Sequence, residues 1–457
     1  MIAPTPGTTV PTTSADAPPP IEAILPPTPW SWRLAIAAGV GILGLTAYLL
    51  HTTLGYRFQA GMGILCFLGV AAFFSKSLQS VSRKTLLWGI ALQFVLAVAV
   101  IHSPQVRVIF ETIGLGIKAL IAASDKGGEF VFGSLAKVDG PSGFIFAFKA
   151  LPPIIFVSAF FSVLYYLGVL QLLVKLMARV MMYLMGTSGA ETLSVSANVF
   201  MGQTEAPLIV KPFVPRMTQS ELLALMGSGM AHISGGMMAV YISYGADPVS
   251  ILSTCVMACP CSLYLTKLIL PEAGKPETMG QSPVSVETPY VNAIDAAAAG
   301  VKDGLWLALN VAAMLIGFLA FIALFDIILG NIHEGWTLDA FFGQLFAPVA
   351  FLLGVDPSEC NKVGNLLGIK LAANEHVAFL KLKEWKLAGG ILTERSQLLA
   401  VYALTGFANF ASVGIQLGGI GSIAPGRRAD LARLGMKALF VGFLSTLINA
   451  AVAGVLM

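Results

Sequence analysis

Polar side chains capable of binding a solute lie inside an apolar stretch of the chain at residues 198–207. Gln203, Thr204 and Glu205 stand together there, with a glycine just before them and a proline two residues after. A carboxylate, an amide and a hydroxyl are costly in hydrocarbon unless they face protein, water or a ligand. Glycine and proline argue against one regular helix at this point. Residues 187–213 therefore predict two half-helices that meet at a polar tip, which is typical of a solute site in a membrane.

The same pattern occurs a second time near the C-terminus. Residues 364–378 form a short, broken hydrophobic segment with Asn374 and Glu375 at its centre. Each such hairpin is followed by an apolar helix with small and polar residues in its middle, first at 222–244 and then at 398–417. Interrupted segments in corresponding positions of two halves predict a transporter with its site between two repeats.

Glu205 and Glu375 are the two carboxylates most clearly placed at membrane depth. They can accept hydrogen bonds from a polar solute or hold a cation. The alternative is that each pairs with a neighbouring base, Lys211 or Lys370, as structural support. The amides and hydroxyl nearby favour a ligand rich in donors and acceptors, such as a sugar or a base. Phe407 can stack on a flat ring, or it can simply pack in the core.

The composition identifies the compartment in which these residues work. Of the 457 residues, 56% are hydrophobic and only 11% are charged, and the mean hydropathy is +0.81. A soluble protein carries roughly 25% charged residues. The chain is therefore predicted to be an all-α polytopic membrane protein. Its net charge of +3 gives no argument for a nucleic-acid partner.

Cys259-Pro260-Cys261 offers a different function, because such a motif in a membrane helix can bind a soft metal in a cation pump. That function needs a nucleotide-binding and phosphorylation domain, and the sequence has no insert of that size. Buried small thiols are the simpler interpretation. No nucleophile–base set, phosphate loop or cofactor motif occurs, so we predict that the protein is not an enzyme. An ion channel or structural protein would leave the two polar hairpins unexplained.

Apolar runs predict about nine transmembrane helices in addition to the two re-entrant hairpins. Residues 33–50, 58–75, 86–101 and 150–174 are the first four of these spans. The loop between the second and third carries three basic residues and no acid, which places it and the N-terminus in the cytoplasm and the C-terminus outside. Residues 105–140 alternate apolar with charged positions and predict amphipathic helices at an interface.

The chain divides into five parts on this basis. These are a disordered Pro-rich tail at 1–32, N-terminal spans and interfacial helices at 33–186, the first hairpin with its interrupted helix at 187–270, a loop with further spans at 271–358, and the second hairpin with its interrupted helix and last span at 359–457.

Four motifs resemble the concentrative nucleoside transporters of bacterial type. They are GQTEAPL at 202–208, the NE pair at 374–375, GFANF at 406–410 and GGIGSIAPGRRADLARLGMKAL at 418–439. The resemblance runs from about residue 58 to the C-terminus. It implies inverted repeats, a scaffold domain mostly within 33–186 and 271–358, and a transport domain at 187–270 and 359–457 that moves as an elevator. It also implies a homotrimer in the cell inner membrane that imports nucleosides with a cation and has no other cofactor.

The resemblance also implies roles for individual residues. The nucleobase contacts are Gln203, Thr204, Glu205, Met237 and Phe407. The ribose hydroxyls are held by Glu375, Asn409 and Ser412. The sodium ligands are Asn198, Met201 and Ile233, largely through backbone carbonyls and the asparagine side chain, which suits a hard cation.

His232 departs from the family pattern, which has serine or threonine before the isoleucine of the sodium site. An imidazole is not a hard oxygen ligand, and it can be protonated near neutral pH. We expect sodium coupling. Proton coupling through His232 is therefore the alternative. His376 and Phe379 also replace the usual aromatic and tyrosine, so the preference for purine or pyrimidine stays open.

Overall fold

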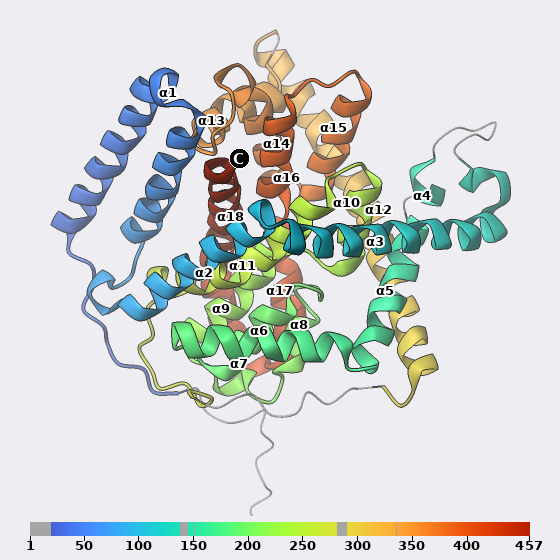
Figure 1. Ribbon diagram of the computed structural model, residues 1–457, viewed down its shortest axis with the longest axis horizontal. Helices are drawn as coiled ribbons and strands as arrows, with labels where there is room; N and C mark the ends of the chain where they lie inside the picture. The colour runs from blue at the N-terminus through green and yellow to red at the C-terminus, as the bar shows by residue number, and fades with distance from the viewer. Residues whose placement is uncertain (1–19, 138–144, 150, 281–289, 335) are drawn as a thin grey trace, which may run out of the picture.

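Helices build the whole fold in the computed structural model, which describes residues 20–137, 145–149, 151–280, 290–334 and 336–457 (Figure 1). No β-strand occurs within these ranges. The prediction of an all-α protein is therefore confirmed. Most of the predicted Pro-rich tail lies outside the described residues.

The N-terminal helices include one long helix pair and one helix that lies crosswise. Helix α1 (Trp30–Phe73) is two helices separated at Gly55, whose φ of 77° favours a residue without a side chain. Helix α2 (Arg83–His102) follows, and α3 (Pro104–Phe132) runs across the direction of α1 in Figure 1. This orientation is the one that the prediction of an interfacial helix requires.

The span predicted over residues 150–174 extends too far: the stretch Ala147–Tyr166 is long and apolar enough to cross a membrane, but the chain turns after it. After the short α4 (Phe146–Lys149), helix α5 (Leu151–Tyr166) ends just before Gly168, which has a left-handed φ of 82°. The chain then turns into α6 (Val169–Met185), which lies crosswise in Figure 1. The apolar run is continuous, but the turn at Gly168 divides it between two directions.

The first repeat contains the first hairpin, an interrupted helix and one continuous helix. The hairpin has the arms α7 (Gly189–Ala197) and α8 (Ala206–Ile209). The interrupted helix is α9 (Gln219–Ala231) with α10 (Gly235–Ser243), and α11 (Pro248–Ile269) follows. The second arm is much shorter than the predicted half-helix, because prolines at 212 and 215 remove the amide donors that would continue it.

The second repeat has the same order of elements. Between the repeats lie α12 (Ala293–Ile332) and α13 (Leu338–Leu352). The second hairpin is α14 (Cys360–Ala372) with α15 (Glu375–Leu387). The interrupted helix is α16 (Glu394–Leu404) with α17 (Phe410–Ile423), and α18 (Arg428–Leu456) ends the chain.

The two repeats pack against each other through glycines in the buried core. A Cβ atom at Gly442 of α18 would lie 2.3 Å from Cβ of Met230 on α9. A Cβ atom at Gly227 of α9 would lie 2.8 Å from the Val441 side chain of α18. Small residues let helix backbones approach closely. This close packing stabilises helix association in a membrane, where the hydrophobic effect does not drive helices together. This contact joins the interrupted helix of one repeat to the last helix of the other.

A buried charged cluster closes the base of the first hairpin. Ser188 with Glu191 caps α7, and Thr218 with Glu221 caps α9, each as a capping box. The Nζ atom of Lys267, on α11, lies 2.7 Å from Oε2 of Glu191. The cluster therefore fixes the base of the hairpin to two helices.

The segment before α1 is extended and crosses the same end of the molecule. Glu22 accepts a hydrogen bond from the backbone N–H of Gln219, the first residue of α9. The N–H of Ala23 donates to the carbonyl of Ala273 at 2.9 Å. Residues 20–29 therefore connect the start of α1 to the start of α9.

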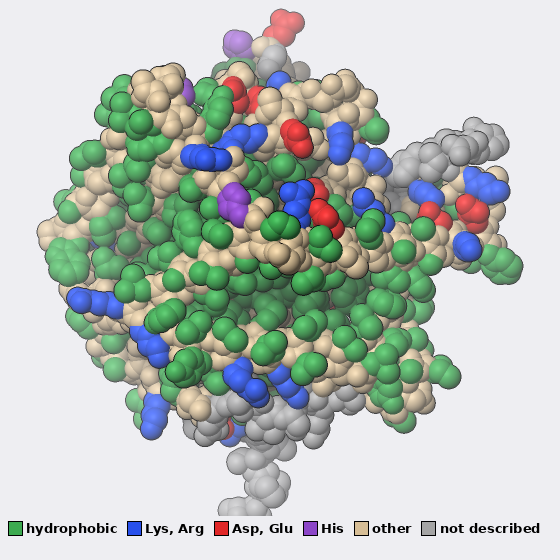
Figure 2. Space-filling view, in the orientation of Figure 1, with side chains coloured by type: hydrophobic (Ala, Val, Ile, Leu, Met, Phe, Trp, Pro, Cys, Tyr) green, Lys and Arg blue, Asp and Glu red, His purple; other side chains and the backbone are tan. Residues whose placement is uncertain are grey.

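Seven stretches within the described ranges are long and apolar enough to cross a membrane. One of them is α1, which holds two helices, and the broken pair α16–α17 is not among them. The count of nine spans stays a prediction. Figure 2 shows hydrophobic side chains over the middle of the viewed face, with lysine and arginine mainly toward its upper and lower parts.

Candidate solute-binding site

The two interrupted helices break at polar residues that cap the second half of each helix. Between α9 and α10, the Ser234 side chain accepts a hydrogen bond from the N–H of Met237. Between α16 and α17, the Asn409 side chain accepts one from the N–H of Ser412 at 2.9 Å. These caps satisfy amides that a break would otherwise leave without partners in an apolar interior.

The two breaks contact each other and the tip of the first hairpin. The N–H of Phe407 donates to the carbonyl of His232, and the N–H of Gly235 donates to the carbonyl of Phe200, both at 3.1 Å. Gly406 has a φ of +152°, and a Cβ there would lie 3.1 Å from the carbonyl oxygen of Ala231. The structure thus brings together three irregular segments that are far apart in the sequence.

Glu375 is the centre of a buried hydrogen-bond network at the second hairpin. Its Oε1 accepts from the hydroxyl of Tyr241 at 2.8 Å, and its Oε2 accepts from Nδ2 of Asn409 at 2.9 Å. Asn374 caps α15 through the N–H of Val377. The expected ribose ligands Glu375 and Asn409 are therefore in direct contact.

Gln203 extends this side of the site from the first hairpin. Its Nε2 donates to Oγ of Ser412 at 3.3 Å, and its Oε1 accepts from Nε2 of Gln416 at 3.2 Å. Thr204 packs beside Gly419, where an added Cβ would lie 2.7 Å from its methyl group. Gln203 and Thr204 therefore face α17, and Gln203 lies next to the expected ribose ligand Ser412.

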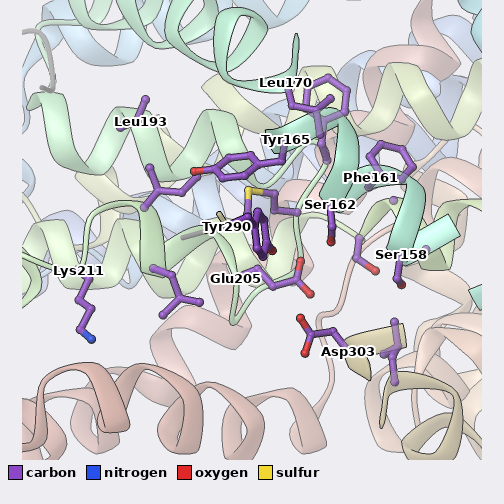
Figure 3. Close-up of a pocket in the computed structure, with 18 of the residues that line it drawn as sticks. Ser158, Phe161, Ser162, Tyr165, Leu170, Leu193, Glu205, Lys211, Tyr290 and Asp303 are labelled. Atoms are coloured by element: carbon purple, nitrogen blue, oxygen red, sulfur yellow. The ribbon is translucent and has the colours of Figure 1, made fainter. Parts of the chain in front are cut away.

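Glu205 faces a different space, a cavity of about 670 Å³ between the first hairpin, the start of α10, α5 and α12 (Figure 3). Met201 also lines this cavity. The other expected base and ribose residues do not line it. The predicted residues therefore divide between this cavity and the buried network around Glu375.

Asn198 supplies an oxygen that suits a hard cation. Its Nδ2 donates to the carbonyl of Ser194 and to Oγ of Ser228 at 3.0 Å. Its Oδ1 is buried and has no hydrogen-bond partner among the residues that the structure describes. A buried carbonyl oxygen without a donor is costly, so a bound cation would stabilise it. Met201 and Ile233 lie near the same tip and break, since Phe200 bonds to Gly235.

Both ring nitrogens of His232 have neighbours within hydrogen-bond distance. Its Nδ1 donates to the carbonyl of Ser228 at 2.7 Å, and its Nε2 lies 3.4 Å from Sγ of Cys259. Because a carbonyl only accepts, the proton is on Nδ1 and Nε2 faces the thiol. This geometry matches the simpler alternative, in which the imidazole bonds a neighbouring carbonyl.

The basic residues near the two glutamates do not pair with them. Nζ of Lys370 donates instead to the carbonyl of Ala403 at 2.7 Å and to Oγ1 of Thr446 at 2.9 Å. Within the described part of the chain, no ion pair includes Glu205 or Glu375. The alternative of structural pairing with Lys211 or Lys370 is therefore not what the structure shows.

The cysteines give no metal site. All five are buried, and no group of three or more metal-binding side chains occurs among the residues that the structure describes. Cys259 contacts His232 and backbone carbonyls instead. The metal-transport alternative has no geometric support.

Three residues of the site were missed from the sequence. Tyr241 and Gln416 are single polar residues on apolar helices, and only the folded chain shows that they bond Glu375 and Gln203. Asp303 lines the cavity, but it lies within residues 271–358, which were predicted only as a loop with further spans. Phe379 stacks on Tyr241 with 4.2 Å between ring centroids, so it supports the donor to Glu375.

Two hairpins and two interrupted helices gather polar side chains inside an apolar helical body, and this arrangement defines a secondary membrane transporter built from repeats. The chain belongs to the family of Na+-dependent nucleoside transporters, as the resemblance to the concentrative nucleoside transporters predicted. The N-terminal model of that family matches residues 62–135, a nucleoside-recognition model matches residues 147–248, and the C-terminal model matches residues 250–454.

Relatives and solved structures agree with this family. A protein of Haemophilus influenzae described as an uncharacterized transporter is 39% identical over 402 residues, which cover 86% of this chain and 96% of the relative. Sodium/nucleoside cotransporter 1 of Mus musculus is 39% identical over 443 residues, which cover 93% of this chain and 67% of the mouse protein. The structure of CNTnw in an inward-facing substrate-bound state matches with a TM-score of 0.82 at 36% identity, over 88% of this chain and 98% of that one. These relatives are transporters and not enzymes.

Proposed function

We propose that the protein is a symporter that imports nucleosides together with sodium ions. The observation that carries this proposal is that one helical body holds both an unpartnered buried oxygen on Asn198 and a buried hydrogen-bonding network on Glu375. The first suits a hard cation, and the second suits a sugar with two hydroxyls. The names of the mouse relative and of the family models support the same activity.

Glu375 and Asn409 are proposed to bind the ribose. In the absence of a nucleoside, each carboxylate oxygen of Glu375 is occupied by one donor, and each oxygen can accept a second. A nucleoside that lacks a ribose hydroxyl would leave buried acceptors without partners, and the site would reject it. Ser412, bonded to Gln203, completes this side of the site.

The base is proposed to lie at the tip of the first hairpin, between the cavity that Glu205 lines and the break before Asn409. Glu205 faces the cavity, and Gln203 and Thr204 extend from the same tip toward α17. Met237 and Phe407 are proposed as apolar contacts to the base, one from each interrupted helix.

Coupling follows from the position of the cation ligands. Asn198 and Met201 belong to the first hairpin, and Ile233 belongs to the break between α9 and α10. A sodium ion bound to all three would hold the tip, and with it Gln203 and Glu205, in the arrangement that binds the base.

We further propose that the chain forms a homotrimer in the inner membrane, with a cytoplasmic N-terminus and periplasmic C-terminus. The two repeats would move as an elevator against a scaffold of the remaining helices.

Uptake into proteoliposomes tests this function. The purified protein is reconstituted, and labelled uridine and adenosine uptake is measured with a sodium gradient and with a pH gradient imposed separately. We expect saturable uptake that is driven by sodium. Absence of uptake of either nucleoside under both gradients would refute nucleoside symport. Uptake driven by pH alone would replace sodium with the proton as coupling ion.

A further inference from the structure

The side chain of Glu205 has a fixed position at the tip of the first hairpin. Its Oε2 accepts a hydrogen bond from the N–H of Gly202 at 2.7 Å. The carboxylate is therefore folded back over its own turn, and Glu205 lines the cavity. An acceptor held in this way can meet a donor of a ligand without first being ordered.

A second carboxylate lines the cavity beside Glu205. Asp303 lies on α12, and Figure 3 shows its carboxylate next to that of Glu205, with the two side chains coming from different elements. Their like charges act on each other. One carboxylate belongs to the hairpin and the other to a helix outside both repeats.

Close packing of α12 on α5 determines the position of Asp303. A Cβ at Gly300 would lie 2.6 Å from the Cα of Ala159, and a Cβ at Gly304 would lie 2.7 Å from the Cα of Ile155. These two glycines let the backbones touch on either side of Asp303. The helix cannot rotate without losing this contact, so the carboxylate stays directed at the cavity.

The rest of the cavity suits a flat ring. Aromatic side chains form much of its wall. They are Phe161 and Tyr165 from α5, Phe200 and Phe213 from the hairpin region, and Tyr290 before α12. Aromatic faces stack on heterocycles, and a volume of about 670 Å³ has room for a nucleobase. The two carboxylates are acceptors that line the same space.

We propose that Asp303 is a specificity-determining residue that, with Glu205, recognises the exocyclic amino group of cytosine or adenine. This inference rests on the proposed nucleoside transport. An amino group has two N–H donors, and each carboxylate accepts one of them. Uracil and hypoxanthine present a carbonyl oxygen at that position, which cannot donate to either carboxylate and leaves at least one of them without a partner. Cytidine and adenosine are therefore preferred over uridine and inosine.

Kinetics of Asp303→Asn test this inference. Uptake of labelled cytidine and uridine into proteoliposomes is measured under a saturating sodium gradient for the parent protein, Asp303→Asn and the matched control Lys302→Gln. Lys302 is the exposed neighbour on the same helix. We expect the parent protein to have a KM for cytidine at least about tenfold below that for uridine, because a polar site discriminates against a mismatched ligand. In Asp303→Asn the two KM values become similar, since the amide can donate to the uracil carbonyl. In Lys302→Gln the ratio is unchanged.

The other outcomes separate the possible errors. If the parent protein transports no nucleoside, the proposed function itself is refuted. If it transports both and Asp303→Asn leaves the ratio of KM values unchanged, only the role of Asp303 is refuted. If Asp303→Asn changes the sodium dependence and not the ratio, the carboxylate pair binds a cation, which also overturns the inference. Thermal melting of each variant in detergent checks that the protein is folded.

Discussion

The backbone N–H of Phe407 donates a hydrogen bond to the carbonyl of His232, at 3.1 Å. Each residue lies in the break of a different interrupted helix. The carbonyl at the end of α9 and the amide before α17 lie where the helices are interrupted, so neither has a partner within its own helix. Each supplies the hydrogen-bond partner that the other lacks. The two repeats are therefore joined at the point where both are irregular, beside the ligands proposed for the cation.

Replacing Asn198 by alanine removes the buried oxygen without a donor. We expect the sodium concentration for half-maximal uptake to rise at least about tenfold, because a hard cation loses a ligand. The KM for nucleoside at saturating sodium changes much less. The measurement is uptake against sodium concentration, with Asn331→Ala at an exposed position as the control. An unchanged sodium dependence would remove Asn198 from the cation site.

Glu375→Ala removes the acceptor at the centre of the network. We expect ribonucleoside uptake to fall at least about a hundredfold, because ribose hydroxyls and Tyr241 would lose their partner. Tyr241→Phe removes one donor and keeps the carboxylate, so its loss is smaller. Exposed Glu384 provides the control Glu384→Ala. Near-normal transport by Glu375→Ala would refute the ribose role.

His232→Asn distinguishes the two coupling ions. The asparagine Nδ2 can replace Nδ1 in the hydrogen bond to the Ser228 carbonyl, but it cannot take a second proton. We expect sodium-driven uptake to be retained, with no change in its dependence on external pH. Uptake is measured under separate sodium and pH gradients. Loss of a pH-driven component present in the parent protein would restore His232 as the coupling residue.

Lys267→Met leaves Glu191 and Glu272 without their cation. The carboxylate oxygen of Glu191 lies 2.7 Å from Nζ and is buried, so breaking this pair costs about 3–5 kcal/mol. We expect a lower melting temperature in detergent. Lys118→Met, at an exposed position on α3, is the control and melts like the parent protein. Equal melting of both variants would show that the cluster does not stabilise the base of the hairpin.

The sequence predicted the broken elements best. Glycine, proline and polar residues within apolar segments are costly in a membrane, so residues such as Glu205 and Glu375 mark the breaks directly. The turn at Gly168 was missed because the apolar run continues through it. Gln416 was missed because its partner Gln203 is 213 residues away, and one residue pattern cannot show that contact. Asp303 was missed because it stands at the edge of a polar stretch.

Through the hydrogen bond between Glu22 and Gln219, the segment before α1 tethers the first repeat to α1. Seven residue steps separate Glu22 from Pro29, which precedes α1. An extended chain covers at most about 3.5 Å for each step, so the backbone from Glu22 to Pro29 spans at most about 25 Å. While this bond is intact, the start of α9 cannot travel farther than that from the start of α1. A larger displacement of the first repeat must first break the hydrogen bond between Glu22 and Gln219.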